Sequence, residues 1–134
     1  PRLSSLCDTL RFSPGNLRRY PHQLSEVERR RVALMRALML DPDLLVIDDP
    51  FAGLDAMSRY ALRTEVASIV QGLGKARLFS SGVLADCVAM SDDVVLLRAG
   101  VIAQRGSPRD LATSPANLFV SEFVKAQRGA ADEE

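Results

Sequence analysis

The sequence predicts an α/β fold in which parallel strands are flanked by helices and followed by a C-terminal hairpin. Three observations support this prediction. A capped amphipathic helix leads into the apolar run Leu44–Ile47, which shows no alternation, as expected for a parallel strand covered on both faces. A second amphipathic helix, 57–73, leads into a short strand at 78–81. Two further apolar runs bracket Arg98-Ala99-Gly100 and predict the hairpin.

Length and composition fit a single globular domain. The chain has 134 residues, and a hydrophobic share of 47% is enough to bury a core. Seventeen basic and seventeen acidic residues cancel, so no nucleic-acid partner is expected. No apolar run approaches the roughly 20 residues of a membrane span. Cys7 and Cys87 lack metal-ligand spacing and are interpreted as buried free thiols in a reducing cytosol.

The first segment carries a helical apolar stripe at Leu3, Leu6 and Leu10, followed by the turn 13–16. It enters directly into a helix without a starting methionine, so we expect further sequence before residue 1. The central helix begins at Ser25, which forms a capping box with Glu28. Its arginines are interpreted mostly as a solvated face, and Asp41-Pro42-Asp43 ends the helix.

The rest of the chain is predicted to be mainly helical around the hairpin. Leu62, Val66, Ile69 and Val70 point inward from helix 57–73. The expected later elements are a short helix at 84–90, hairpin strands at 94–97 and 101–104, a helix opened by Ser107-Pro108, a last helix at 117–125 and an unstructured acidic tail at 129–134.

Two adjacent carboxylates, Asp48 and Asp49, follow the apolar run Leu44–Ile47. They stand at the carboxyl end of the predicted strand, where open α/β sheets place ligands. One carboxylate would hold a magnesium ion carried by a phosphate ligand, and the other would orient or deprotonate water. The alternative is a pair of solvated loop acids.

These segments together resemble the C-terminal part of an ATP-binding cassette (ABC) ATPase. Leu24–Leu38 resembles the signature LSGGQ with its basic helix, Leu44–Pro50 the Walker B strand ending in D-E-P, and Ala52–Asp55 the D-loop. Residues 91–93 with VVLLRAGVIAQRGSP resemble the A-D-R-I strand and the return strand ending in G-T-P. Phe51-Ala52-Gly53 also resembles cassettes of bacterial Mce-type lipid importers.

The resemblance covers roughly residues 20–112 and implies a partial P-loop NTPase (RecA-like) sandwich. Residues 1–128 would be the C-terminal part of an ABC ATPase domain, followed by the tail 129–134. In the family sheet, the strand that enters the phosphate loop lies between those matching 78–81 and 94–97. Because that strand is absent here, the isolated chain would have to close the gap between two half-sheets or leave two strand edges open. We therefore expect the isolated chain to be marginally stable.

The resemblance also implies roles for individual residues. Ser25 and the backbone of Glu26, Val27 and Glu28 would contact the γ-phosphate of ATP bound on a second subunit, since a helix N-terminus presents free N–H groups to anions. Two of these residues depart from the family, because Glu26 and Val27 replace the signature glycines. A carboxylate about 5 Å from a phosphate charge would oppose binding by roughly 3 kcal/mol at an effective dielectric of about 20.

The remaining implied roles lie after the strand. Asp48 would hold Mg²⁺ through water, and Asp49 stands where the catalytic glutamate is usual. Asp49 is one methylene shorter, which predicts slow hydrolysis. Asp55 would cross the dimer interface. The switch histidine of the family would fall at Ser81-Gly82, where no histidine occurs.

The sequence contains no G-x-x-x-x-G-K-S/T motif, so it lacks the phosphate cradle. Gly72-Leu73-Gly74-Lys75 is interpreted as a helix C-cap. The favoured prediction is the ATPase subunit of an ABC transporter, inactive as an isolated chain. It would form a head-to-tail dimer with a second ATPase subunit and would lie in the cytoplasm, peripheral to the inner face of the membrane, through a transmembrane permease. The alternatives are a degenerate, non-hydrolysing cassette that acts as a binding or regulatory module, and a soluble ABC-type ATPase of DNA repair or translation.

Overall fold

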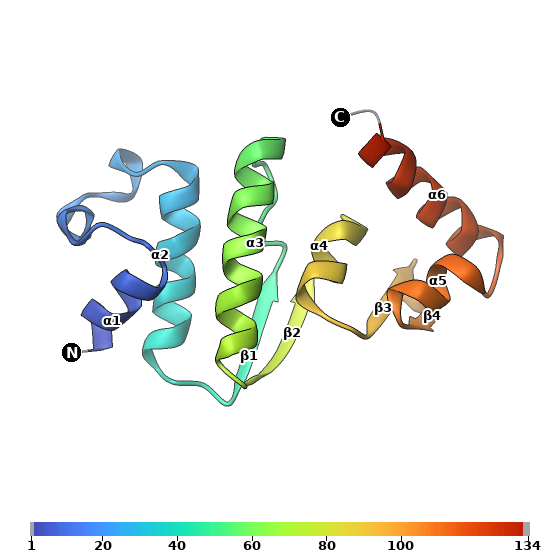
Figure 1. Ribbon diagram of the computed structural model, residues 1–134, viewed down its shortest axis with the longest axis horizontal. Helices are drawn as coiled ribbons and strands as arrows, with labels where there is room; N and C mark the ends of the chain where they lie inside the picture. The colour runs from blue at the N-terminus through green and yellow to red at the C-terminus, as the bar shows by residue number, and fades with distance from the viewer. Residues whose placement is uncertain (1, 133–134) are drawn as a thin grey trace. The chain divides into compact units, whose positions relative to one another are not determined.

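The computed structural model describes residues 2–132, with side chains for 2–128. It divides into two compact units, Pro1–Ser81 (unit 1) and Gly82–Glu134 (unit 2). Unit 1 contains, in chain order, α1 (Arg2–Thr9), the 3₁₀ turns η1 (Pro14–Arg18) and η2 (Pro21–Gln23), α2 (Glu26–Met39), β1 (Leu44–Asp48), α3 (Ala56–Gly72) and β2 (Ala76–Ser80) (Figure 1). Unit 2 contains α4 (Leu84–Met90), β3 (Val94–Arg98), β4 (Val101–Gly106), α5 (Pro108–Thr113) and α6 (Leu118–Asp132).

The two strands of unit 1 form a parallel pair. Their register runs from Leu44 beside Ala76 to Asp48 beside Ser80, so both strands end at the same edge. The connection between them is α3, which begins and ends within one residue of the predicted helix. The mixed α/β class predicted from the sequence is confirmed, with parallel strands here and a hairpin in unit 2.

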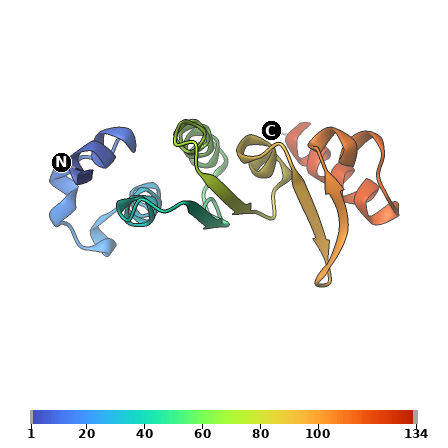
Figure 2. The same cartoon turned by 90° about the horizontal axis from the view of Figure 1, so that it is seen from below.

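The β1–β2 pair is covered on one face only. Leu45 is 3% exposed, whereas Leu44 and Val46 on the same strand are 54% and 61% exposed, and Leu78 on β2 is 61% exposed. In Figure 2, α3 lies on one side of the pair, and no described helix of unit 1 covers the other side. The expectation that this strand is covered on both faces is therefore wrong for the described residues, because successive side chains point to opposite faces and only one face meets helices.

A charge cluster joins α1 to the loops at the ends of α2 and α3. Asp41 Oδ1 lies 3.0 Å from Arg2 Nη2 and 2.8 Å from Lys75 Nζ. Arg2 Nη2 also donates to the Leu38 carbonyl, 2.8 Å away, at the end of α2. The pKa of Asp41 is lowered to about 2. The largest cause is the hydrogen bond from Arg2, and the second largest is the hydrogen bond from Lys75. The cluster links three segments of unit 1 through one carboxylate.

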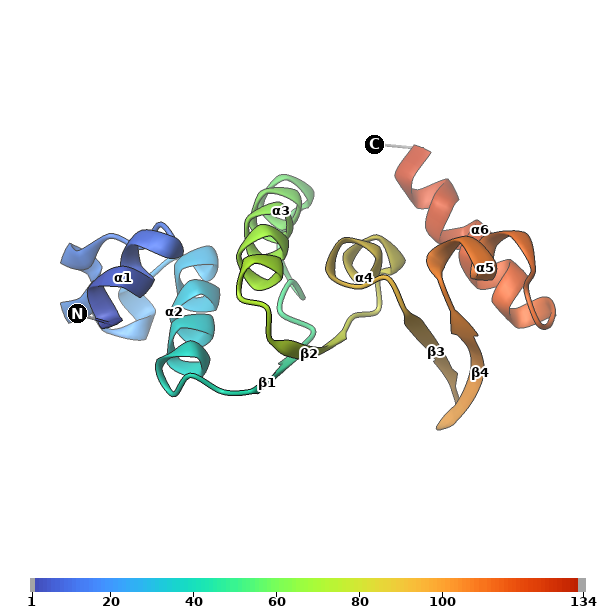
Figure 3. The same cartoon turned by 60° about the horizontal axis from the view of Figure 1, so that its bottom comes forward.

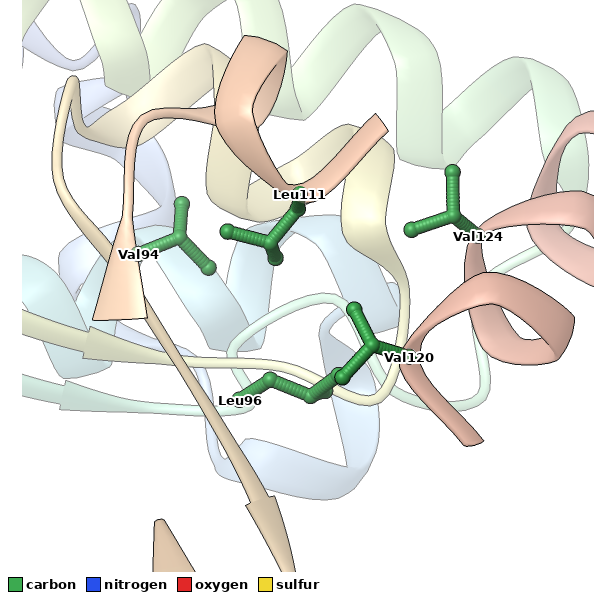
Figure 4. Packing of buried hydrophobic residues seen from close by; sticks show 5 residues of the cluster. All are labelled: Val94, Leu96, Leu111, Val120 and Val124. Atoms are coloured by element: carbon green, nitrogen blue, oxygen red, sulfur yellow. The ribbon is translucent and has the colours of Figure 1, made fainter. Parts of the chain in front are cut away.

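Unit 2 is built on the antiparallel hairpin β3–β4, with α5 and α6 beside it (Figure 3). Its core combines one face of β3 with the two helices (Figure 4). The side chains that meet there are Val94, Leu96, Leu111, Val120 and Val124. The alternate β3 residues Val95 and Leu97 are 45% and 60% exposed, so this strand, like β1, has one open face.

In the described residues, β2 pairs only with β1 and β3 only with β4. The predicted pair of half-sheets is therefore observed. The described chain forms two compact units. This division does not test whether residues 1–128 form one domain, so the single domain stays a prediction.

The last helix is longer than predicted, since α6 extends to Asp132. Of the tail predicted at 129–134, residues 129–132 are helical, and 133–134 lie outside the described residues.

Candidate functional site

The two predicted carboxylates lie at the carboxyl end of the parallel pair. Asp48 is the last residue of β1 and Asp49 follows it. Ser80, the last residue of β2, contacts both: its hydroxyl donates to Asp48 Oδ1, while the Asp49 N–H donates to the Ser80 carbonyl at 3.0 Å and to the Ser80 hydroxyl at 3.2 Å. Ser80 was not predicted as a site residue. Only the register of β1 against β2 identifies it.

The backbone of Asp49 adopts an uncommon conformation. Its φ of 38° lies in the left-handed region, which aspartate tolerates better than most non-glycine residues. Such conformations cost on the order of 1–3 kcal/mol and cluster at functional sites. Within residues 2–128, Asp49 Oδ1 is buried without a hydrogen-bond partner. A carboxylate with a free acceptor atom at a sheet end is able to accept a proton or a hydrogen bond from water.

The loop after Asp49 is anchored by Phe51. Its side chain is 0% exposed, and its ring centroid lies 5.8 Å from that of Phe79. Gly53 has a φ of 76°, a conformation that glycine adopts without steric cost. The loop therefore has a defined path between Asp49 and the start of α3.

Asp55 ends this loop as the N-cap of α3. Its carboxylate accepts from the Ser58 N–H at 2.9 Å, and the hydrogen bonds of Ser58 lower the pKa of Asp55. This contact accounts structurally for an aspartate at this position. The role across a dimer interface stays a prediction.

Ser25 is the N-cap of α2, and the predicted capping box is confirmed. The Glu28 N–H donates to Ser25 Oγ at 3.2 Å, and the Ser25 N–H donates to Glu28 Oε2 at 2.8 Å. These bonds lower the pKa of Glu28, with the Ser25 backbone as the largest cause. Asn16 Nδ2 donates to the other carboxylate oxygen of Glu28 at 2.5 Å. Contact of this segment with a phosphate stays a prediction.

Glu26 is paired with two arginines on its own helix. Arg29 Nη2 contacts Glu26 Oε2, and Arg30 Nη2 lies 3.0 Å from Glu26 Oε1. The hydrogen bond from Arg29 is the main cause that lowers the pKa of Glu26. The carboxylate is therefore held toward residues three and four positions further along the helix. The repulsion of phosphate expected from the sequence was worked out for an unpaired carboxylate. The two arginine partners reduce that repulsion.

Two arginines of α2 are not the solvated face that the sequence predicted. Arg30 Nη2 donates to the Ala52 carbonyl at 2.9 Å, in the loop between Asp49 and Asp55. Arg31 Nη2 lies 2.7 Å from Glu65 Oε2 on α3, and the two side chains are 20% and 13% exposed. Both contacts join α2 to segments far along the chain, which a helical pattern alone does not reveal.

The other predicted site residues are less directly connected to the sheet end. Val27 is half-buried in the first turn of α2. Ser81 is half-buried and directly follows β2, whereas Gly82 is exposed and begins unit 2. The Gly82 carbonyl accepts from Gln127 Nε2 at 3.4 Å within that unit. Nucleotide contacts of these three residues stay predictions.

The oxygen atoms at the end of the β1–β2 pair fit Mg²⁺ better than a softer metal. Asp48 and Ser80 present a carboxylate and a hydroxyl, and Mg²⁺ usually takes one or two carboxylates plus phosphate oxygens and water. Within residues 2–128, no group of three or more His, Cys, Asp or Glu side chains is placed to hold a metal by itself. A metal here would therefore depend on a phosphate ligand.

A cavity of about 200 Å³ lies between α2, β1 and α3. Its wall is mainly apolar, with Leu34, Leu45 and Phe51 among the lining residues. Ligand pockets usually measure roughly 300–1,000 Å³, so this cavity is small for a nucleotide. The candidate site is therefore the carboxylate edge itself.

Every helix within residues 2–132 is too short or too polar to span a bilayer.

Comparison with known proteins agrees with the motifs. Residues 3–52 match the family described as ABC transporter. The glycine betaine/carnitine/choline transport ATP-binding protein OpuCA of Bacillus subtilis is 35% identical over 127 residues, which are 95% of this chain and 33% of OpuCA. The Fe(3+) ions import ATP-binding protein FbpC of Brucella melitensis is 40% identical over 106 residues, which are 79% of this chain and 30% of FbpC.

The choline transport ATP-binding protein OpuBA of Bacillus subtilis is 34% identical over 127 residues, which are 95% of this chain and 33% of OpuBA. The chain thus spans about a third of the length of these curated relatives. The similarity extends beyond the range 20–112 on which the resemblance was first based. With motifs, fold class and relatives in agreement, the chain belongs to the ABC transporter family of ATP-binding proteins.

Proposed function

We propose that this chain is the C-terminal part of the ATP-binding domain of an ABC transporter, where ATP binding and hydrolysis drive substrate movement through a permease. The observation that supports this most strongly is the sheet end, where Ser80 contacts the carboxylate of Asp48 and the backbone N–H of Asp49. Arg30 connects the adjoining loop to the helix that begins at Ser25. The carboxylates and the signature-like helix therefore belong to one connected structure.

In this proposal, Asp48 holds Mg²⁺ through water and Asp49 orients the attacking water. ATP supplies the phosphoryl group, and Mg²⁺ neutralises charge on its phosphates. Ser25 and the backbone at 26–28 meet the γ-phosphate bound by a second subunit in a head-to-tail dimer. Asp55 lies at the contact with that subunit, and Ser81-Gly82 lies near the γ-phosphate.

The isolated chain is proposed to be inactive. Its sequence contains no G-x-x-x-x-G-K-S/T, so the backbone N–H groups and lysine that would bind the β- and γ-phosphates are not supplied by these residues. The exposed apolar side chains Leu44, Val46 and Leu78 also leave one face of the strand pair uncovered. Both observations agree with a domain that is completed by further sequence.

The cargo is not part of the proposal. One relative is named for glycine betaine, carnitine and choline, and another for Fe(3+) ions. Since chemically different cargoes occur among relatives of similar identity, identity at this level does not select one. The likeness of Phe51-Ala52-Gly53 to Mce-type cassettes stays a prediction. The subunit is proposed to act at the cytoplasmic face of the membrane, held there by its permease.

Calorimetric titration with ATP, with and without Mg²⁺, tests the proposal on the subunit extended to include its upstream sequence. We expect Asp48→Ala to weaken ATP binding only when Mg²⁺ is present, because the carboxylate acts through the metal. Asp43→Ala is the matched control, since Asp43 is exposed just before β1. Equal binding by wild type and Asp48→Ala in Mg²⁺ would contradict the metal role.

A degenerate, non-hydrolysing cassette is the second candidate. The replacement of the signature glycines by Glu26 and Val27, together with Asp49 in place of glutamate, favours it. Phosphate release under single-turnover conditions separates the two candidates, because a binding module retains ATP unchanged. No feature of the described residues favours an ATPase of DNA repair or translation, and the balanced charge is against nucleic-acid binding.

A further inference from the structure

Arg30 makes two contacts through a single nitrogen atom. Its Nη2 lies 3.0 Å from Glu26 Oε1 on the same helix and 2.9 Å from the Ala52 carbonyl oxygen, 22 residues along the chain. A guanidinium Nη atom carries two N–H groups. Nη2 therefore forms an ion pair with the carboxylate and donates a hydrogen bond to the carbonyl.

Glu26 orients this guanidinium. A charge-assisted bond to a carboxylate is about twice as strong as a bond between neutral groups. The ion pair therefore holds the guanidinium at the position from which Nη2 donates to the Ala52 carbonyl. The side chain of Arg30 is 34% exposed, so the pair is partly protected from solvent. The position of Ala52 is thereby tied to the first turn of α2.

Ala52 lies midway between the two predicted site residues of the loop. It is three residues after Asp49 and three before Asp55. The Ala52 N–H donates to the Asp49 carbonyl at 3.3 Å, so the same residue is tied to Asp49 through its own backbone. Phe51 fixes the loop from the core side, and Arg30 fixes it from the helix side.

We propose that Arg30, oriented by Glu26, is a positioning residue that couples the signature-like start of α2 to the placement of Asp49 and Asp55. This inference rests on the proposed ATPase function. Glu26 replaces a glycine of the family signature, and here it acts as the anchor of Arg30. The pair transmits a displacement of the α2 N-terminus to the loop that carries Asp49.

The test uses the complete subunit with its permease, and measures kcat for ATP hydrolysis together with the Kd for ATP. We expect Arg30→Met to lower kcat about tenfold to a hundredfold, as for a misplacement of up to about 1 Å, while the Kd changes less than about twofold. Glu26→Gln keeps the shape but removes the charge, so its kcat should lie between those of wild type and Arg30→Met. Arg36→Met is the matched control, because Arg36 is exposed on the same helix, and it should retain wild-type kcat.

Hydrogen exchange of the amides at 52–55 gives a second readout on the same proteins. Faster exchange there in Arg30→Met, with unchanged exchange in β1, supports the inference. A wild-type kcat in Arg30→Met, or a weakened Kd with unchanged kcat, overturns it while leaving the proposed function intact. A wild-type subunit that binds but does not hydrolyse ATP refutes the hydrolytic function and the positioning role together.

Discussion

Adjacent residues of β1 give a direct test of the half-covered sheet. Leu45 is 3% exposed and Val46 is 61% exposed, although both are aliphatic side chains of the same strand. Leu45→Ala removes a buried side chain and leaves a cavity, which costs about 2–5 kcal/mol of unfolding free energy. Val46 buries only about two fifths of its surface. Scaling the roughly 1.5 kcal/mol of a fully buried valine gives about 0.6 kcal/mol for Val46→Ala.

Urea unfolding followed by far-UV circular dichroism measures both variants. We expect the isolated chain to be marginally stable, so Leu45→Ala should be unfolded without urea, whereas Val46→Ala should shift the midpoint only slightly. Equal losses in the two variants would refute the one-sided packing. A cooperative thermal transition of the monomeric chain at high temperature would also contradict the expected marginal stability.

The same two substitutions in the longer subunit test whether other sequence covers the open face. If the sheet is completed there, the cost of Val46→Ala should rise to about 1.5 kcal/mol or more, because the side chain loses contact with water. The cost of Leu45→Ala should remain in its previous range, which makes it the internal control. A cost for Val46→Ala that stays near about 0.6 kcal/mol would show that the face remains exposed.

Three further experiments test contacts in unit 1. The folded-state pKa of Asp41 is lowered from 3.8 to about 2. The stability that this carboxylate contributes is therefore present above pH 4 and is lost as the pH falls toward 2. Urea midpoints measured between pH 5 and 2 should fall less steeply in Asp41→Asn than in the wild type, and identical slopes would count against the charge cluster. A double-mutant cycle with Arg31→Met and Glu65→Gln should give a coupling of about 1–3 kcal/mol, above the roughly 0–1 kcal/mol of an exposed pair; a coupling near zero would mean that solvent screens the contact. Ser80→Ala should cost about 1 kcal/mol in urea unfolding, because the hydroxyl contacts Asp48 and the Asp49 N–H, and an unchanged midpoint would refute its anchoring role.

Local features of the site were predictable because neighbouring residues determine them. The capping box of Ser25 and Glu28 depends on side chains three positions apart, and the structure confirms it. The strand that ends at Asp48 was predicted from its continuous apolar run and is present as β1. The family resemblance was likewise predictable, since it depends on motif letters and their spacing.

Contacts between distant segments depended on the tertiary structure. Ser80 contacts Asp48 across 32 positions because of the strand register, and Arg30 reaches Ala52 because the loop after β1 approaches α2. The helical pattern placed Arg30 and Arg31 in solvent, since the periodicity of one helix carries no information on what lies against it. An apolar run likewise does not state whether one face or both are covered, as Leu45 and Val46 show. The sequence alone thus determined the local elements and the motifs, whereas the tertiary structure decided which side chains meet, because strand register and packing depend on segments far apart in the chain.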